Sequence, residues 1–147
     1  MPLQYSTKLR NAQMSMVLAC TNGLTITSSA ITGTATGGTL KIRTGTLPAN
    51  CAAADTGTVL ATFTLSTSWL NAAASGAVTL ASTISDTSAD ATGVAGHFRI
   101  YDSSNACQMQ GNITSPGGGG ALILDNTSIT AGQIVDIGTF TLTAANS

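Results

Sequence analysis

The pattern of apolar and polar positions is most regular in residues 96–102, Gly-His-Phe-Arg-Ile-Tyr-Asp. Phe98 and Ile100 occupy one parity, whereas His97 and Arg99 occupy the other. Because side chains alternate between the two faces of a strand, this period of two predicts a β-strand with one buried face. The rest of the chain consists of short runs of Thr, Ala, Val, Ile and Leu. We therefore expect residues 96–102 to form the central strand.

Shorter alternations predict further strands, bounded by turns rich in Gly, Asn, Asp and Pro. A change of parity near Gly138 predicts a β-bulge. About seven or eight strands with turns at this spacing are typical of an all-β domain, here a jelly-roll-like β-sandwich or barrel. The predicted strands lie within residues 24–36, 39–44, 58–66, 78–84, 96–102, 107–113, 122–124 and 133–143.

The N-terminal residues carry the one helical pattern. Apolar residues recur at spacings of three and four, which predicts a helix or arm over residues 6–21 that ends at Asn22-Gly23. This helix either covers the β domain or docks on a partner. We expect residues 1–147 to be a single domain, with the β-sandwich in residues 24–147. The predicted helical stripe consists of Tyr5, Leu9, Ala12, Met16 and Ala19.

Charge is scarce, because only 7% of the residues are charged and the formal net charge is −1. With five basic residues the chain is a poor candidate for nucleic-acid binding, which depends on neutralising many phosphates. No run of 18 apolar residues predicts a membrane span, and the N-terminus lacks a secretory pattern. We expect the chain to stay in a bacterial cytoplasm unless a particle carries it out. So few charges suit a protein packed against neighbours.

No residue pattern predicts a reaction, a metal site or a cofactor. The six Asp residues show no paired spacing, and His97 has no nucleophile elbow nearby. The run Gly117–Gly120 lacks the Lys of a phosphate loop, and the Asp-rich turns do not match an EF-hand. Cys20, Cys51 and Cys107 lack CxxC spacing, so we expect small thiols that are buried or half-buried; a Cys51–Cys107 bridge stays open.

Candidate partner contacts follow from expected exposure and charge alone. On the predicted strand 39–44, Leu40 and Ile42 face the core, so Lys41 and Arg43 should face out. Trp69 is expected to close an edge of the core, with an interface role as the alternative. Residues 45–57 form a loop long enough to suggest a role. The candidate contacts are Lys8 and Arg10 in the helix, Lys41 and Arg43 in the strand, and Pro48 and Asn50 in the loop.

Three runs of sequence resemble small structural proteins of tailed phages. They are GGTLKIRTGTLPANCAAADTGTVLATFTLS (37–66), ADATGVAGHFRIYDSS (89–104) and ALILDNTSITAGQIVDIGTFTLT (121–143), in this order after an N-terminal helix. The chain is similar to the head decoration, or cement, proteins of this group. The resemblance covers nearly the whole chain, but it rests on turns and strand patterns rather than on a chemical fingerprint.

The resemblance implies a jelly-roll-like fold on the outside of a capsid. The partner would be an HK97-fold major capsid protein, and the chain would tie neighbouring capsomers together as a dimer or trimer. It brings no catalytic residues with it, and the charge and apolar patterns above predict neither a nucleic-acid nor a membrane partner. The alternative is a receptor- or glycan-binding module of a phage tail or fibre, which should show clustered Trp and Tyr. Pilus subunits and small hydrolases fit the residues less well.

Overall fold

The computed structural model describes residues 6–26, 31–32 and 36–144. These residues form one helix followed by short strands, which confirms the predicted all-β class with a single N-terminal helix. The elements are α1 (Thr7–Thr21), β1 (Thr25–Ile26), β2 (Ile31–Thr32), β3 (Gly38–Thr44), β4 (Val59–Leu65), β5 (Ala77–Thr79), β6 (Ile84–Asp86), β7 (Gly93–Tyr101), β8 (Cys107–Thr114), β9 (Leu122–Ile123), β10 (Ser128–Ile129), β11 (Val135–Ile137) and β12 (Thr141–Thr143).

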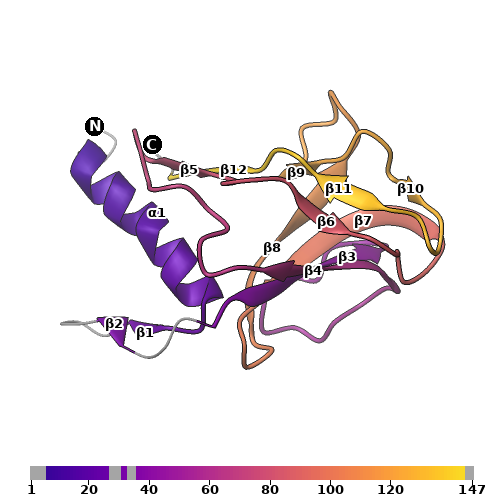
Figure 1. The fold of residues 1–147 in the computed structure, drawn as a ribbon, viewed down its shortest axis with the longest axis horizontal. Coiled ribbons are helices and arrows are strands. Elements are labelled where there is room, and N and C mark those ends of the chain that lie inside the picture. The colour runs from indigo at the N-terminus through magenta and orange to yellow at the C-terminus, as the bar shows by residue number, and fades with distance from the viewer. Residues whose placement is uncertain (1–5, 27–30, 33–35, 145–147) are drawn as a thin grey trace.

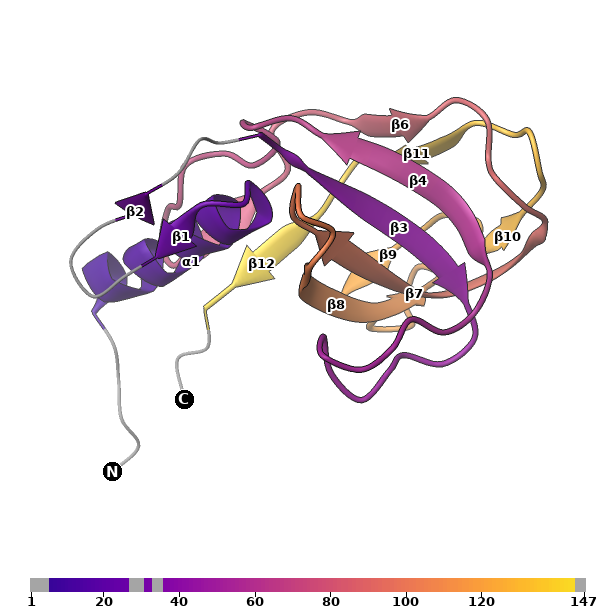
Figure 2. The same cartoon turned by 90° about the horizontal axis from the view of Figure 1, so that it is seen from below.

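The main sheet has the spatial order β4-β3-β7-β8-β9, and β10 also pairs with the start of β7. Neighbouring strands are antiparallel, except that β9 runs parallel to β8. Figure 2 shows this sheet curling into a half-barrel. β7 lies in its middle, which confirms residues 96–101 as part of the central strand; Asp102 follows the strand.

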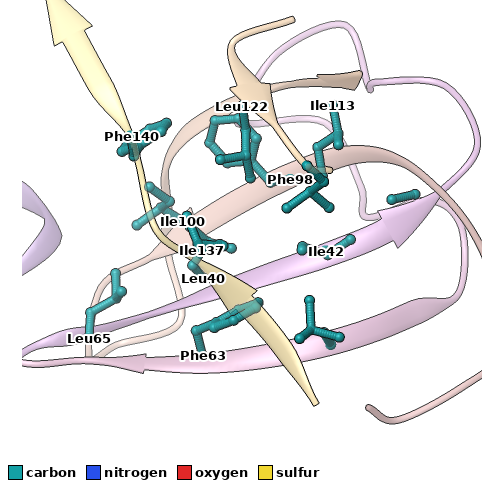
Figure 3. Packing of buried hydrophobic residues seen from close by; sticks show 14 of the residues in the cluster. Leu40, Ile42, Phe63, Leu65, Phe98, Ile100, Ile113, Leu122, Ile137 and Phe140 are labelled. Carbon is teal, nitrogen blue, oxygen red and sulfur yellow. The ribbon is translucent and has the colours of Figure 1, made fainter. Parts of the chain in front are cut away.

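The hydrophobic core lies on the concave side of the curled sheet. The ribbons β6–β11 and β5–β12 face this side and close it (Figure 1). Side chains from β3, β4 and β7 meet Ile137 of β11 there, as Figure 3 shows. Phe98 packs edge-on against Phe140, with ring centroids 5.6 Å apart. Burying each such large side chain stabilises the fold by roughly 1.5–3 kcal/mol, so this layer is the main source of stability.

Helix α1 lies at one end of the long axis, beside β5 and β12 (Figure 1). It ends at Asn22-Gly23 as predicted, with Gly23 at φ 71°. The predicted apolar stripe is confirmed at Ala19, which is buried, but it is wrong at Ala12 and Met16, which are exposed. Met14, Val17 and Leu18 pack against the core instead. Tyr5 and the side chain of Leu9 lie outside the described residues.

Two bonds fix the helix to the β domain. Trp69 is buried and donates its indole N–H to Thr21 Oγ1 at 3.2 Å, so it closes the core edge under the helix as predicted. Asn11 Oδ1 accepts the backbone N–H of Gly76 at 2.5 Å. These bonds place α1 over the open end of the β domain. The alternative, in which the helix is an arm that docks on a partner, stays a prediction.

Two strand predictions need correction. Residues 78–84 are not one strand, because β5 and β6 separate there and pair with different partners. Residues 133–143 likewise divide into β11 and β12. Gly138 lies in the break between these strands rather than in a bulge. β6 pairs with β11 and β5 pairs with β12, so neither segment pairs continuously with a single partner strand.

Candidate functional site

The outer, convex face of the sheet carries a layer of polar side chains. His97, Arg99 and Tyr101 project from β7, and the neighbouring β3 adds Arg43. We expected this face to be open, but His97, Arg99 and Tyr101 are buried, and Arg43 is only 8% exposed. The cover is the 45–58 loop, the segment between β3 and β4, which runs on the side of the sheet opposite β6 and β11 (Figure 1). The central strand therefore has two buried faces.

Arg99 is the centre of this layer and is 1% exposed. Its Nη2 atom donates to the backbone carbonyls of Asn50, Cys51 and Ala53, at 3.0, 3.1 and 3.1 Å. Its Nε atom donates to Gln110 Oε1 of β8 at 3.1 Å. A planar guanidinium can satisfy several acceptors at fixed angles, which an ammonium cannot do. Arg99 therefore fixes the path of the loop backbone.

Asp55 supplies the negative charge that the two buried arginines need. Its carboxylate accepts from Arg99 Nη1, from Arg43 Nη2 at 2.6 Å and from the Tyr101 hydroxyl at 2.7 Å. Burial acts to raise the pKa of Asp55, but the Tyr101 and Arg99 hydrogen bonds and both positive charges outweigh it and lower the pKa from 3.8. The carboxylate thus stays ionised and clamps the end of the loop to the sheet.

His97 closes the layer at the start of the loop. It is fully buried, and its Nδ1 lies 3.2 Å from the carbonyl oxygen of Gly45. Because a carbonyl only accepts, Nδ1 carries the proton in this contact. Nε2 has no hydrogen-bond partner among the described residues. Burial, together with the nearby charges of Arg43 and Arg99, lowers the pKa of His97 from 6.5, against the opposing effects of Gly45 and Asp55.

The structure clarifies the positions of several candidate contact residues. Arg43 and Pro48 are buried, which corrects the expectation that Arg43 lies on an open face. The charge of Arg43 pairs with Asp55, and the carbonyl of Pro48 accepts Gln110 Nε2 at 2.7 Å. Asn50 is exposed, and its side chain caps the backbone N–H groups of Ala52 and Ala53, both at 2.9 Å. These residues hold the loop in shape.

The remaining basic candidates are partly covered. Lys41 is half-buried, and its Nζ lies 5.2 Å from the centroid of the Tyr101 ring, a cation–π distance. Arg10 is half-buried beside Gly76. The side chain of Lys8 lies outside the described residues. Their roles as partner contacts therefore stay predictions.

The acidic turns support the backbone. Asp86 Oδ2 accepts the Thr62 N–H of edge strand β4, and Asp90 accepts the Thr62 hydroxyl, both at 2.8 Å. Asp102 accepts the N–H groups of Ser104 and Ala106 at 2.8 and 3.0 Å. Across the described part of the chain, no three His, Cys, Asp or Glu side chains gather into a set able to hold a metal ion. Because Asp86 accepts the Thr62 N–H, this part of the β4 edge cannot pair with an added strand.

All three cysteines are half-buried, as expected. Cys51 of the loop and Cys107 of β8 are close neighbours, with their Sγ atoms 2.7 Å apart.

Cys20 lines a separate groove of 310 Å³ between α1 and β8, together with Met16, Val17 and Met109. The groove is mainly apolar and gathers no acid–base pair. Within the described ranges, no helix is long and apolar enough to cross a membrane.

Sequence reasoning missed Asp55 as the partner of the buried arginines. A signal was present, because Lys41 and Arg43 alternate on a predicted strand that leads into a loop with one acid, and Arg99 alternates with Phe98 and Ile100 on the predicted central strand. What the sequence could not supply was the register that sets Lys41 opposite Arg99 and Arg43 opposite His97. Only that pairing places both guanidinium groups under the loop.

Compared with protein-family models, with curated proteins and with solved structures, the chain gives no match. A functional conclusion therefore rests on the geometry above and on the resemblance carried by the sequence runs.

Proposed function

We propose that this chain is a head decoration, or cement, protein of a tailed phage. It binds the outer surface of an HK97-fold major capsid protein shell as a dimer or trimer and strengthens the contacts between capsomers. It is made in the host cytoplasm and then stays on the exterior of the virion. The proposal joins the resemblance of residues 37–66, 89–104 and 121–143 to one structural observation.

That observation is the pinned 45–58 loop. Its single acid, Asp55, has a side chain that is 38% exposed but is paired to Arg43 and Arg99, so the loop presents no unpaired charge. Loops that are already ordered lose little entropy when they bind, which leaves more of the contact energy for affinity. Apart from Asp55, the exposed residues of the loop are uncharged: Gly45, Thr46, Leu47, Ala49, Asn50, Ala52, Ala54, Thr56, Gly57 and Thr58.

A cement protein needs this kind of surface and no reactive group. Contacts of roughly 1,000–2,000 Å² between each copy and the capsid would slow rupture of a filled head, because the bound copies must dissociate before the capsomers can separate. Small uncharged side chains on a rigid loop allow close approach to a shell without desolvating charges. The buried arginine layer supports the proposal because it holds both arginines beneath the loop and pairs the loop's one carboxylate with them.

The alternative glycan-binding module has less support from the geometry. Sugar sites rely on exposed aromatic rings, but Trp69 and Tyr101 are both buried. Among the residues that the structure describes, no other Trp or Tyr is present to serve as a stacking platform. Binding to glycans therefore remains as an outcome of the experiment below.

The test is co-sedimentation of the purified protein with purified, expanded phage heads that lack decoration. The wild-type chain should sediment with the heads, and Leu47→Asp should weaken binding at least about tenfold, because one buried charge costs more than 1.4 kcal/mol. The matched control is Ile134→Asp, since Ile134 is 63% exposed in the turn before β11, away from the loop. Wild-type protein that ignores heads but binds a glycan array would overturn the proposal.

A further inference from the structure

The 45–58 loop and strand β8 bring two cysteines together that lie 56 positions apart in the sequence. Cys51 Sγ and Cys107 Sγ are 2.7 Å apart, and a disulfide bond measures about 2.05 Å, so the two sulfur atoms already lie within about 0.7 Å of bonding distance. Neither thiol belongs to the exposed residues of the loop proposed to meet the capsid.

The polar layer beneath the loop holds the two sulfur atoms in place. Arg99 donates to the carbonyl of Cys51 itself, which fixes the loop backbone at that residue. On the sheet, Cys107 is the register partner of Tyr101, and Tyr101 donates to Asp55 at the end of the same loop. Both cysteines are therefore bound to one rigid frame, and the local concentration of each thiol around the other is high.

We propose that Cys51 and Cys107 are a redox-modification site that forms an intrachain disulfide when the folded protein meets a small disulfide oxidant such as oxidised glutathione. The bond staples the 45–58 loop to β8. In a reducing solution the pair stays as two thiols, as is usual inside cells, and the loop is held only by the non-covalent contacts of the polar layer, centred on Arg99 and Asp55. The inference stands independently of the proposed function.

The chemistry is two thiol–disulfide exchanges. Cys51, as its thiolate, attacks one sulfur of oxidised glutathione, forms a mixed disulfide and releases one glutathione thiolate. Cys107 then loses its proton to solvent and attacks the Cys51 sulfur, which releases the second glutathione. Two protein thiols are oxidised, and one glutathione disulfide is reduced to two thiols.

This order of attack follows from the environment of Cys107. Burial, followed by the contact with Cys51, raises the pKa of Cys107 to about 12, which keeps it protonated at neutral pH. A protonated thiol is a poor first nucleophile, but as the second partner it acts on a sulfur that is already in contact. The remaining cysteine, Cys20, lies on α1 in the groove beside Met109 and serves as an internal control.

The test compares wild type, Cys20→Ala and Cys51→Ala, each incubated in the folded state with oxidised glutathione at pH 8. Free thiols are then counted after denaturation without reductant, and the non-reduced digest is mapped by mass spectrometry. Wild type should fall from three free thiols to one, and Cys20→Ala from two to none. The digest of both should link the peptides that contain Cys51 and Cys107, and Cys51→Ala should give no intrachain link.

Thermal unfolding supplies the second readout. Closing a loop of this length in the unfolded chain should raise Tm by about 10 °C relative to the reduced protein, and dithiothreitol should reverse the rise. The Cys20→Ala variant should show the same rise, and Cys51→Ala should show none. Three thiols that persist in wild type, a stable glutathione adduct, a link to Cys20, or an unchanged Tm after oxidation would each overturn the inference.

Discussion

Arg99, in the middle of the central strand, forms an ion pair with Asp55, which lies 44 positions earlier near the end of the 45–58 loop. The arginine side chain is 1% exposed and the carboxylate 38% exposed, so the pair joins the interior to the surface. The same guanidinium also donates hydrogen bonds to three loop carbonyls. The shape of the loop thus depends on one buried cation and on the acid that neutralises it.

Replacing Asp55 by Asn should destabilise the fold by about 2 kcal/mol, because Arg99 and Arg43 would remain under the loop without a counter-charge. The value lies below that of a fully buried pair since solvent reaches the carboxylate. Urea unfolding measures it, and Asp125→Asn, an exposed turn change, is the control that should stay within about 0.5 kcal/mol. Equal stability of Asp55→Asn and wild type would show that the ion pair does not hold the loop.

Stability should fall as the pH drops below 6.5, the usual pKa of histidine. Burial lowers the pKa of His97 in the folded state, so between the two pKa values the unfolded chain binds the extra proton and is favoured. The slope reaches at most about 1.4 kcal/mol per pH unit. His97 is the only histidine and the chain has no Glu, so this window is free of other side-chain titrations near pH 6.

Urea midpoints measured from pH 7.5 to 5 check this dependence, and His97→Gln should remove the slope even if it lowers the stability at every pH. A second fall below about pH 3.8 should persist in that variant, because the pKa of Asp55 is lowered in the folded state and its contribution is lost as the carboxylate protonates. A slope that survives in His97→Gln above pH 5 would contradict the assignment.

Gly96→Ala should destabilise the fold by about 2 kcal/mol, because a Cβ at this position would lie 2.0 Å from the carbonyl oxygen of Gly45. The strand and the start of the loop would have to separate, which also disturbs the contact between Gly45 and His97. Gly138→Ala is the matched control, since its Cβ would meet nothing within 4 Å. If the two alanine variants unfold at the same urea concentration, the close approach of loop and strand is not needed for stability.

Local pattern was enough to predict the class, the helix limits and the central strand. Alternation around Phe98 and Ile100 depends only on neighbouring residues, and Gly23 ends α1 through its own backbone freedom. The helix face could not be predicted in this way. Met14, Val17 and Leu18 face the core because the helix docks through Thr21 and Trp69, a contact between distant parts of the chain.

The polar layer shows the same limit of local pattern. Arg43 has the alternation of an outward-facing cation, and a strand with one solvated face is the usual result. The 45–58 loop overrides it by folding back across the outer face, guided by Asp55 and by Arg99 on a strand that arrives much later in the sequence. The sequence shows Asp55, Arg43 and Arg99, but it does not show that their side chains lie in contact in the fold.

The central claim is that the pinned loop is the face that meets a capsid. A cryo-electron microscopy map of expanded heads incubated with the purified protein tests it most directly. If the loop is the capsid-binding face, we expect added density on the outer surface between capsomers, with residues 45–58 turned toward the shell and residues 130–134 turned away. Heads without added density, or bound protein whose 45–58 loop points into solvent, would contradict it.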